Sequence, residues 1–365
     1  MSRFKKILKW SLVSLLGLFI TVFAFGYWFI SLIPKAETNA GLSETVAASL
    51  PYLSEDIIPN RGKVLAVVTS TDQMGSSGKK TGYELTELSR AYYVFQANGF
   101  EVDIASPQGG QPPVIIDDED MGSYDFAFLN DSFAQAKTKN TLSLSEVDPT
   151  AYEAIYFVGG KGAMYDFPDN PEIQSIVRDY YESGKVVGAV CHGPAALVNV
   201  TLSNGDYLIK GKSVSSFTNK EELFLIPDAK TIFPFLLEDR LVENGAEFKE
   251  GSMYLENVVI EQNIVTGQNP WSTWKLAETM ISQMGYEPKK RKISGEENAI
   301  KVLGSYQKQG FASAKLLISE MAEDTQELNR TLIAMHGIVS GMQWEIGKAI
   351  ELIRLLKYAK DVAEA

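Results

Sequence analysis

The sequence of 365 residues contains one cysteine, Cys191, and two histidines. A single cysteine excludes an intramolecular disulfide framework, and no spaced cluster of cysteines and histidines offers a zinc site. Basic residues are fewer than acidic ones, and the formal net charge is −12. That charge argues against nucleic acid as a partner, because such binding depends on basic side chains that neutralise phosphates. The composition is still that of a globular protein, since 45% of the residues are hydrophobic and 22% are charged.

The lone cysteine lies in an informative context. An apolar run rich in valine leads from Gly184 into Cys191, and His192, Gly193 and a segment of small residues follow it. This pattern is typical of a nucleophile elbow, in which a strand turns sharply into a helix. The elbow places the thiol above a helix N-terminus, whose partial positive charge favours the reactive thiolate. The alternative is a buried structural cysteine, since free cysteines are among the most buried residues.

The N-terminus predicts a membrane anchor. A basic tip, with Arg3, Lys5, Lys6 and Lys9, precedes an uncharged stretch at 10–33. This stretch of about 24 residues is long enough to span a bilayer as a helix. The positive-inside rule keeps the tip in the cytoplasm and puts the rest of the chain on the other side. The competing interpretation is a cleaved signal peptide with a small-residue site at 24–26, but the apolar run continues past that site.

Strands and helices alternate in the middle of the chain. Strands are predicted at 63–70, 101–106, 154–158, the run into Cys191, 213–217, 258–261 and 264–266, with helices at about 84–98, 171–183 and 271–284. This order predicts an α/β fold with a doubly wound, mostly parallel sheet of the flavodoxin-like, three-layer type. Ligands bind such sheets at the carboxyl ends of the strands, where Cys191 falls.

Changes in composition predict four parts of the chain. Residues 1–34 form the basic tip and the transmembrane anchor, 35–61 a polar linker, 62–286 the α/β domain, and 287–365 a helical C-terminal extension. The basic cluster at 289–292 is expected to be a solvated linker.

The extension carries a heptad-like seam, because apolar positions from Ile318 to Leu356 keep three- and four-residue spacing. One interpretation is a helix for self-association or partner binding, which includes a homodimer. The other is a helical hairpin that breaks near Gly337 and Gly341 and packs on its own domain. His336 is expected to be a packing or surface residue.

Two carboxylates could serve the thiol. Glu84 and Glu87 open the first predicted helix and lie three residues apart, on one helical face. A carboxylate beside a thiol can take and return protons if burial raises its pKa toward neutrality. The alternative is a pair of first-turn acids that interact with the helix dipole. The spacing alone does not choose between the two glutamates.

Two further segments could complete the site. Gly159 and Gly160 follow a predicted strand and could present backbone N–H groups as an oxyanion hole. Glu221 and Glu222 follow another predicted strand and offer an acid that orients the imidazole of His192. The alternative for the two glycines is a turn without a catalytic role, and the alternative for the two glutamates is an ordinary helix start. The sequence does not distinguish these from the functional interpretations.

Six motifs together resemble the PfpI superfamily, which has the class I glutamine amidotransferase-like fold. They are similar above all to the branch of glutathione-independent glyoxalases and heat-shock chaperone-like proteins, and the resemblance runs from about residue 62 to residue 285. The motifs are Gly82 with Glu87, Ala105–Pro107 with Gly109 and Gly110, Gly159-Gly160 with Gly162, Ala189–Pro194, Phe217–Glu222 and Val265–Pro270.

The resemblance implies specific roles. It makes Cys191 the nucleophile, His192 its neighbour in a triad, Glu222 the triad acid and Glu87 the carboxylate that touches the thiol. It further implies that the thiol forms a hemithioacetal with methylglyoxal, and that proton transfer and hydrolysis then give lactate without glutathione, metal or another cofactor. Neighbours at an elbow point in different directions, so contact between the thiol and His192 is not assumed.

One position departs from the family pattern. Lys161 stands where that branch usually has a histidine, and it changes the polarity of the pocket. The expected function is a membrane-anchored, glyoxalase III-like lyase that acts on a small carbonyl compound. The alternatives are an amidase or peptidase that attacks an amide with the same thiol, and a stress chaperone or redox sensor with an exposed thiol of low pKa.

Overall fold

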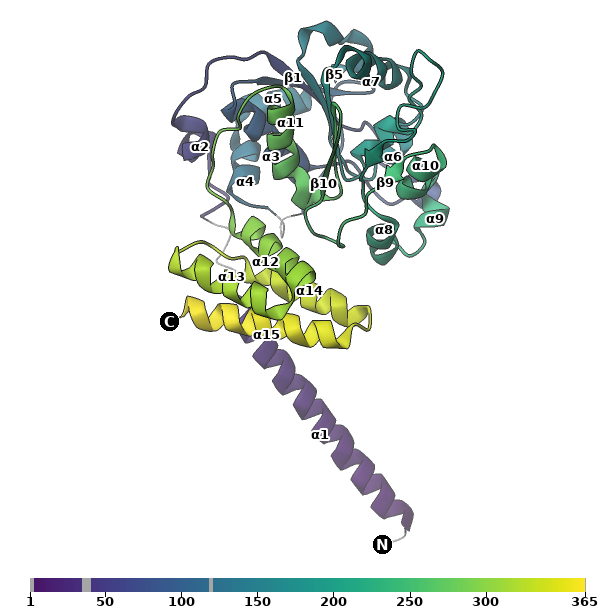
Figure 1. Cartoon of the computed structure of the whole chain (residues 1–365). Coiled ribbons are helices and arrows are strands. Elements are labelled where there is room, and N and C mark those ends of the chain that lie inside the picture. Colours follow the sequence, from purple (N-terminus) through teal and green to yellow (C-terminus); the bar gives the residue numbers. More distant parts are fainter. Residues whose placement is uncertain (1–2, 35–40, 118–120, 365) are drawn as a thin grey trace. The chain divides into compact units, whose positions relative to one another are not determined.

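A computed structural model describes residues 3–34, 41–117 and 121–364 (Figure 1). The chain divides into two compact units, one formed by residues 39–292 and the other by residues 1–38 with 293–365. Residues 35–40 of the predicted linker lie outside the described residues. The same holds for residues 1–2 and for the side chains of the basic tip.

A seven-stranded sheet is the middle layer of the unit 39–292. Its strand order is β10-β11-β7-β6-β1-β3-β5, and every neighbouring pair is parallel except β10 with β11. The strands are β1 (Lys63–Val67), β3 (Glu101–Ser106), β5 (Leu142–Ser143), β6 (Ala154–Phe157), β7 (Val186–Val190), β10 (Val258–Glu261) and β11 (Ile264–Gly267). The predicted mostly parallel sheet is therefore confirmed.

Helices cover both faces of this sheet, and the residues of β1 alternate between two cores. Val64 and Ala66 pack into the core on one face, whereas Leu65 and Val67 pack into the core on the other. The first face carries α3 (Leu85–Ala97), α4 (Ser123–Asn130), α5 (Ser132–Lys139) and α11 (Thr273–Gln283). The second carries α6 (Ala163–Asp166), α7 (Pro171–Ser183), α9 (Ala229–Ile232) and α10 (Leu237–Glu243) (Figure 1). A strand buried on both faces explains the continuous apolar runs of the sequence.

The strand predicted at 213–217 is wrong in most of its length. Only β8 (Ser213–Val214) is a strand, and it pairs with β9 (Glu247–Phe248) in a separate two-stranded sheet. The N–H of Ser215 donates to the side chain of Thr266, and the N–H of Phe217 donates to the carbonyl of Cys191. These two isolated hydrogen bonds take the place of a strand ladder and hold residues 215–217 beside Thr266 and Cys191. A further small sheet pairs β2 (Tyr83–Glu84) with β4 (Val114–Ile115).

The predicted linkers belong to the folded unit wherever they are described. Tyr52, in α2 (Pro51–Ser54), is buried in the core. Lys289 donates through Nζ to the carbonyl of Tyr52 at 2.7 Å and through its N–H to Asn98 at 2.8 Å. Arg291 pairs with Glu278 at 2.8 Å. The expectation of a solvated linker at 289–292 is therefore wrong for Lys289 and Arg291, whereas Lys290 and Lys292 are exposed as expected.

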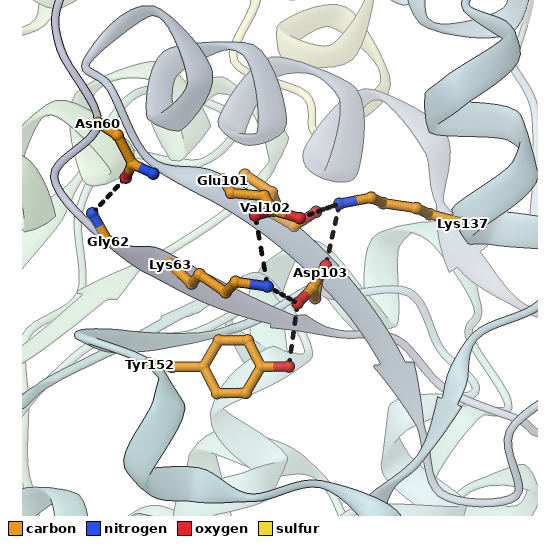
Figure 2. Close-up of polar contacts among 8 residues, drawn as sticks. All are labelled: Asn60, Gly62, Lys63, Glu101, Val102, Asp103, Lys137 and Tyr152. Carbon is orange, nitrogen blue, oxygen red and sulfur yellow. Dashed lines mark hydrogen bonds and ion pairs between the residues drawn. The ribbon is translucent and has the colours of Figure 1, made fainter.

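A polar cluster lies where β1 and β3 begin, at the sheet edge opposite to the carboxyl ends of the strands (Figure 2). Asp103 accepts from Lys137 at 2.9 Å and from the hydroxyl of Tyr152 at 3.1 Å. Lys63 lies 3.4 Å from Asp103 and 3.3 Å from Glu101. Burial would raise the pKa of Asp103, but the hydrogen bond and charge of Lys137 hold it below its usual value.

The other unit contains an apolar helix and four C-terminal helices. Within α1 (Arg3–Leu32), residues 10–32 are long and apolar enough to cross a membrane, although a signal sequence has the same properties. The C-terminal helices are α12 (Gly295–Gln309), α13 (Phe311–Glu323), α14 (Arg330–Met342) and α15 (Ile346–Ala363). The predicted C-terminal helical extension is thus present, and its first helix starts at residue 295 with Ser294 as the cap.

The heptad-like seam is divided between helices, so a single continuous helix over it is wrong. A helical hairpin is present, because α14 and α15 pack together around a tight turn, while its packing on the α/β domain stays a prediction. The turn falls at 343–345, where Trp344 has a positive φ of 63°, whereas Gly337 and Gly341 lie inside α14. The predicted break is therefore displaced toward the C-terminus. His336 is buried, as a packing residue would be.

Candidate active site

Cys191 occupies a sharp turn directly after β7. Its φ is 58°, a left-handed conformation that residues other than glycine rarely adopt. A short 3-10 helix, η5 (Gly193–Leu197), follows with Pro194 in its first turn. The predicted strand and turn are present, but the segment after them is not an α-helix. Gly193 is required here, because a Cβ on it would lie 2.3 Å from the carbonyl oxygen of Phe157.

His192 connects the thiol to Glu222. Its Nδ1 lies 3.3 Å from Sγ of Cys191, and its Nε2 lies 2.5 Å from Oε2 of Glu222. All three side chains are buried. The rings of Phe217 and Phe233 flank the imidazole, with centroids 4.9 and 6.3 Å away. The structure thus brings the adjacent Cys191 and His192 into contact, which the sequence alone did not settle.

Glu87 approaches the thiol from α3. Its carboxyl group is fully buried, and Oε2 accepts a hydrogen bond of 2.8 Å from the N–H of Gly159. The carboxyl group also interacts with the thiol of Cys191. Oε1 has no hydrogen-bond partner of regular geometry among the described residues. The hydroxyl of Tyr156 donates to the carbonyl of Glu87 at 2.9 Å, which holds this turn of the helix.

Burial dominates the electrostatics of the pair formed by Glu87 and Cys191. Burial, followed by the charge of Glu84, raises the pKa of Glu87 well above its usual value. Burial, followed by the charge of Glu87, raises the pKa of Cys191 well above that of an ordinary thiol. The positive charge of Lys161 opposes both shifts. The pair therefore retains a proton at neutral pH.

This result corrects two expectations. The sequence predicted that a helix N-terminus would favour the thiolate, and one alternative needed an exposed thiol of low pKa. The thiol of Cys191 is 3% exposed, and its pKa is raised. Desolvation and two nearby carboxylates outweigh the partial charge of a five-residue 3-10 helix.

Comparisons with known proteins identify the family of this domain. The family model described as the DJ-1/PfpI family matches residues 79–283, which is more than half of the 365-residue chain. The chain belongs to the DJ-1/PfpI family. Glyoxalase 3 of Candida albicans is 33% identical over 237 residues, which cover 60% of this chain and 97% of that protein. Glutathione-independent glyoxalase HSP31 of Saccharomyces cerevisiae is 32% identical over 246 residues, with 61% and 98% covered.

Solved structures are similar to the same domain of this chain. Rapid Encystment Protein 24 KDa of Francisella tularensis is 40% identical, with a TM-score of 0.58, and covers 61% of this chain and 99% of its own. Glyoxalase III of Candida albicans is 31% identical, with a TM-score of 0.55 and coverage of 61% and 97%. The DJ-1/PfpI domain of this chain is thus glyoxalase III-like over almost the whole length of these relatives.

Of the two glycine N–H groups predicted to form an oxyanion hole in this DJ-1/PfpI domain, one is already bonded within the protein. The N–H of Gly159 donates to Glu87, so it is not free for a substrate. No hydrogen bond between described residues uses the N–H of Gly160 or of His192. A Cβ on Gly160 would lie 2.3 Å from the carbonyl oxygen of Gly82, and its φ is 105°. The backbone of Gly160 therefore lies tightly against Gly82 and β2.

Several residues of the DJ-1/PfpI site had no distinct signal in the sequence. Tyr156 lies inside an apolar strand, and only the fold shows that it bonds to Glu87. Tyr254 has a left-handed φ of 56° and packs against Phe217. The sequence predicted Glu221 only together with Glu222, as a possible acid for His192, and gave it no separate role. Within the described residues, no group of three histidine, cysteine or acidic side chains could hold a metal ion.

Proposed function

We propose that this domain converts a small 2-oxoaldehyde to a 2-hydroxy acid without glutathione, as in the conversion of methylglyoxal to lactate. The observation that carries the proposal is the contact of one buried thiol with both Glu87 and His192 at the carboxyl ends of the strands. The similarity to named glyoxalases over the whole domain supports the same reaction. Cys191 is the nucleophile of this proposal.

The reaction needs three balanced steps. The sulfur of Cys191 adds to the aldehyde carbon, and the thiol proton passes to the former carbonyl oxygen, which gives a hemithioacetal. A base removes the proton from the same carbon, a proton is added to the neighbouring keto carbon, and the hydroxyl proton passes to the former keto oxygen, so that a thioester of the hydroxy acid results. Water then cleaves the carbon–sulfur bond, which releases the acid and restores the thiol. The net reaction adds one water to the aldehyde.

Glu87 is suited to move the protons in the second step. Burial raises the pKa of Glu87 well above its usual value, which favours a carboxyl group that holds a proton and can exchange it with the substrate. His192 is suited to activate water in the third step, because Glu222 holds Nε2 and Nδ1 faces the sulfur. Gly160 and His192 have backbone N–H groups that could stabilise the developing oxyanion.

Lactate formation from methylglyoxal tests the proposal directly. We expect turnover by the wild-type chain, no turnover by Cys191→Ala, and a loss of about a hundredfold or more for Glu87→Gln. Asp103→Asn is the matched control, because this carboxylate lies at the opposite edge of the sheet and should leave turnover unchanged. A wild-type chain that converts no 2-oxoaldehyde would overturn the proposal.

The same variants separate the alternatives. Hydrolysis of amide substrates that is lost in Cys191→Ala, without aldehyde turnover, would favour an amidase or peptidase. Suppression of client aggregation that persists in Cys191→Ala would favour a chaperone without a catalytic thiol. The buried thiol disfavours a redox sensor, because oxidation follows exposure and thiolate character.

We also propose that α1 anchors the chain in a membrane as a single pass, with the N-terminus in the cytoplasm and the catalytic domain on the other side. The apolar helix continues to Leu32, past the small-residue site at 24–26. A carbonate wash tests this proposal, since an anchored chain stays with the membrane pellet. Release of a chain that has lost its first residues would identify a cleaved signal peptide instead.

A further inference from the structure

Glu221 is a buried carboxylate whose role is separate from that of its neighbour Glu222. It is 0% exposed, and no ion pair among the described residues neutralises it. Its two oxygens accept five hydrogen bonds from uncharged donors. Oε2 accepts from the N–H and the hydroxyl of Thr218 at 3.0 and 2.9 Å. A buried charge is tolerated in a protein when several donors solvate it in this way.

The donors to Oε1 come from distant parts of the domain. The N–H of Tyr254 lies 2.7 Å away, Nε2 of Gln268 lies 3.1 Å away, and Nδ2 of Asn269 lies 3.0 Å away. The hydroxyl of Tyr254 also donates to the carbonyl of Glu221 at 3.2 Å. One side chain thus ties the first turn of α8 (Asn219–Leu225) to the end of β11 and to the left-handed turn at Tyr254.

Glu222 lacks comparable support of its own. Its Oε2 bonds to His192, while its Oε1 is buried without a hydrogen-bond partner among the described residues. The position of this carboxylate therefore depends on the backbone of the first turn of α8. That turn is fixed by the capping box of Thr218 and Glu221 and by the three donors to Oε1.

We propose that Glu221 is the positioning residue that sets Glu222, and through it the imidazole of His192, at the thiol. Glu221 does not touch the sulfur and carries no proton in the reaction. Its carboxylate holds the first turn of α8 in register with the end of β11. This inference rests on the proposed function for its catalytic consequence, but the placement of the imidazole can be measured without any substrate.

Glu221→Gln is the test variant, because it keeps the shape of the side chain but replaces one accepting oxygen with an NH₂ group. That NH₂ group must face a donor and loses the hydrogen bonds that the oxygen accepted. We expect kcat for methylglyoxal to fall about ten- to a hundredfold with little change in KM. In a Glu222→Gln background, Glu221→Gln should change kcat less than about twofold, because both glutamates act through the imidazole of His192. Equal losses in both backgrounds would overturn the proposal.

A spectroscopic readout makes the test independent of turnover. The chain has two histidines, so ¹⁵N-labelled histidine gives the imidazole signals of His192 and His336 alone. We expect Glu221→Gln to shift the signals of His192 and to leave those of His336 in place. Asp103→Asn, the matched carboxylate-to-amide control, should move neither. Unchanged signals of His192 in Glu221→Gln would overturn the proposal.

A milder variant keeps the test valid if Glu221→Gln does not fold. Thr218→Val removes the hydroxyl that donates to Oε2 of Glu221 at 2.9 Å and preserves the shape of the side chain. It should shift the His192 signals in the same direction and by less. If the wild-type chain converts no 2-oxoaldehyde, the proposed function fails, while the histidine signals still decide whether Glu221 positions the imidazole.

Discussion

Gly159 and Glu87 are in direct contact beside the nucleophile. The N–H of Gly159 donates to Oε2 of Glu87 at 2.8 Å, and a Cβ on Gly159 would lie 2.4 Å from that oxygen. The same Cβ would lie 2.8 Å from Cβ of Cys191. Any side chain at this position would therefore separate the carboxyl group from the thiol. The glycine is needed for space and for its N–H, and its φ is not in the left-handed region.

Gly159→Ala should inactivate the proposed enzyme. The added methyl group displaces Glu87, so we expect lactate formation to fall about a hundredfold or more, and overpacking to lower the free energy of unfolding by about 1–3 kcal/mol. Gly122→Ala is the control, because a Cβ there would meet its nearest neighbour at an ordinary 3.8 Å. Activity assays and calorimetry check both effects. Full activity of Gly159→Ala would show that the thiol does not need this carboxylate.

The charge of Lys161 should control the reactivity of the thiol. Burial and the charges of Glu87 and Glu84 raise the pKa of Cys191, and Lys161 opposes them. Lys161→Met should therefore raise that pKa further and slow alkylation by iodoacetamide at pH 8 about three- to tenfold. Cys191 is the only cysteine, so the reaction reports on one site. Lys161→Arg keeps the positive charge and should be alkylated at the wild-type rate. If Lys161→Met is also alkylated at the wild-type rate, the charge of Lys161 does not control the thiol.

The Asp103 cluster should make stability depend on acid pH. The pKa of Asp103 in the native state is lowered, so ionised Asp103 stabilises the fold above its unfolded value of about 3.9. That stabilisation is lost as the pH falls through the native pKa. Asp103→Asn should cost about 1 kcal/mol at pH 7, and the difference from the wild type should shrink below pH 4. Calorimetry at both pH values checks the sign, and a difference that grows in acid would contradict it.

The turn between α14 and α15 contains backbone strain that a substitution can relieve. Trp344 has a φ of 63°, and its side chain is 86% exposed, so packing does not compensate for the conformation. A left-handed residue other than glycine costs about 1–2 kcal/mol, while glycine loses more backbone entropy on folding. Trp344→Gly should therefore stabilise the C-terminal helices by about 0.5–1 kcal/mol. Trp344→Ala keeps the Cβ and serves as the control, since it should bring no such gain in thermal unfolding.

Much of the α/β unit could be predicted from local patterns. Continuous apolar runs gave β1, β6 and β7, since strands covered on both faces have no polar alternation. The helix at 171–183 was predicted with its observed bounds, because Pro171 starts it and Gly184 ends it. Elements of two residues, such as β8, carry too little pattern to predict.

The sequence by itself determined the chemistry that is available to this protein. One thiol, with a histidine beside it after a buried strand, and ordered motifs around it were enough to place the chain in its family. An apolar helix at the N-terminus could also be read directly. These features are local, because each depends on residue types within one short segment.

Only the tertiary structure decided how these groups work together. It bonded the N–H of Gly159 to the carboxylate of Glu87 and gave the sulfur of Cys191 a contact with His192. It also buried the thiol and reversed the expected direction of its pKa shift. Each outcome depends on residues that are far apart in the sequence, and desolvation arises only when several elements close over one site.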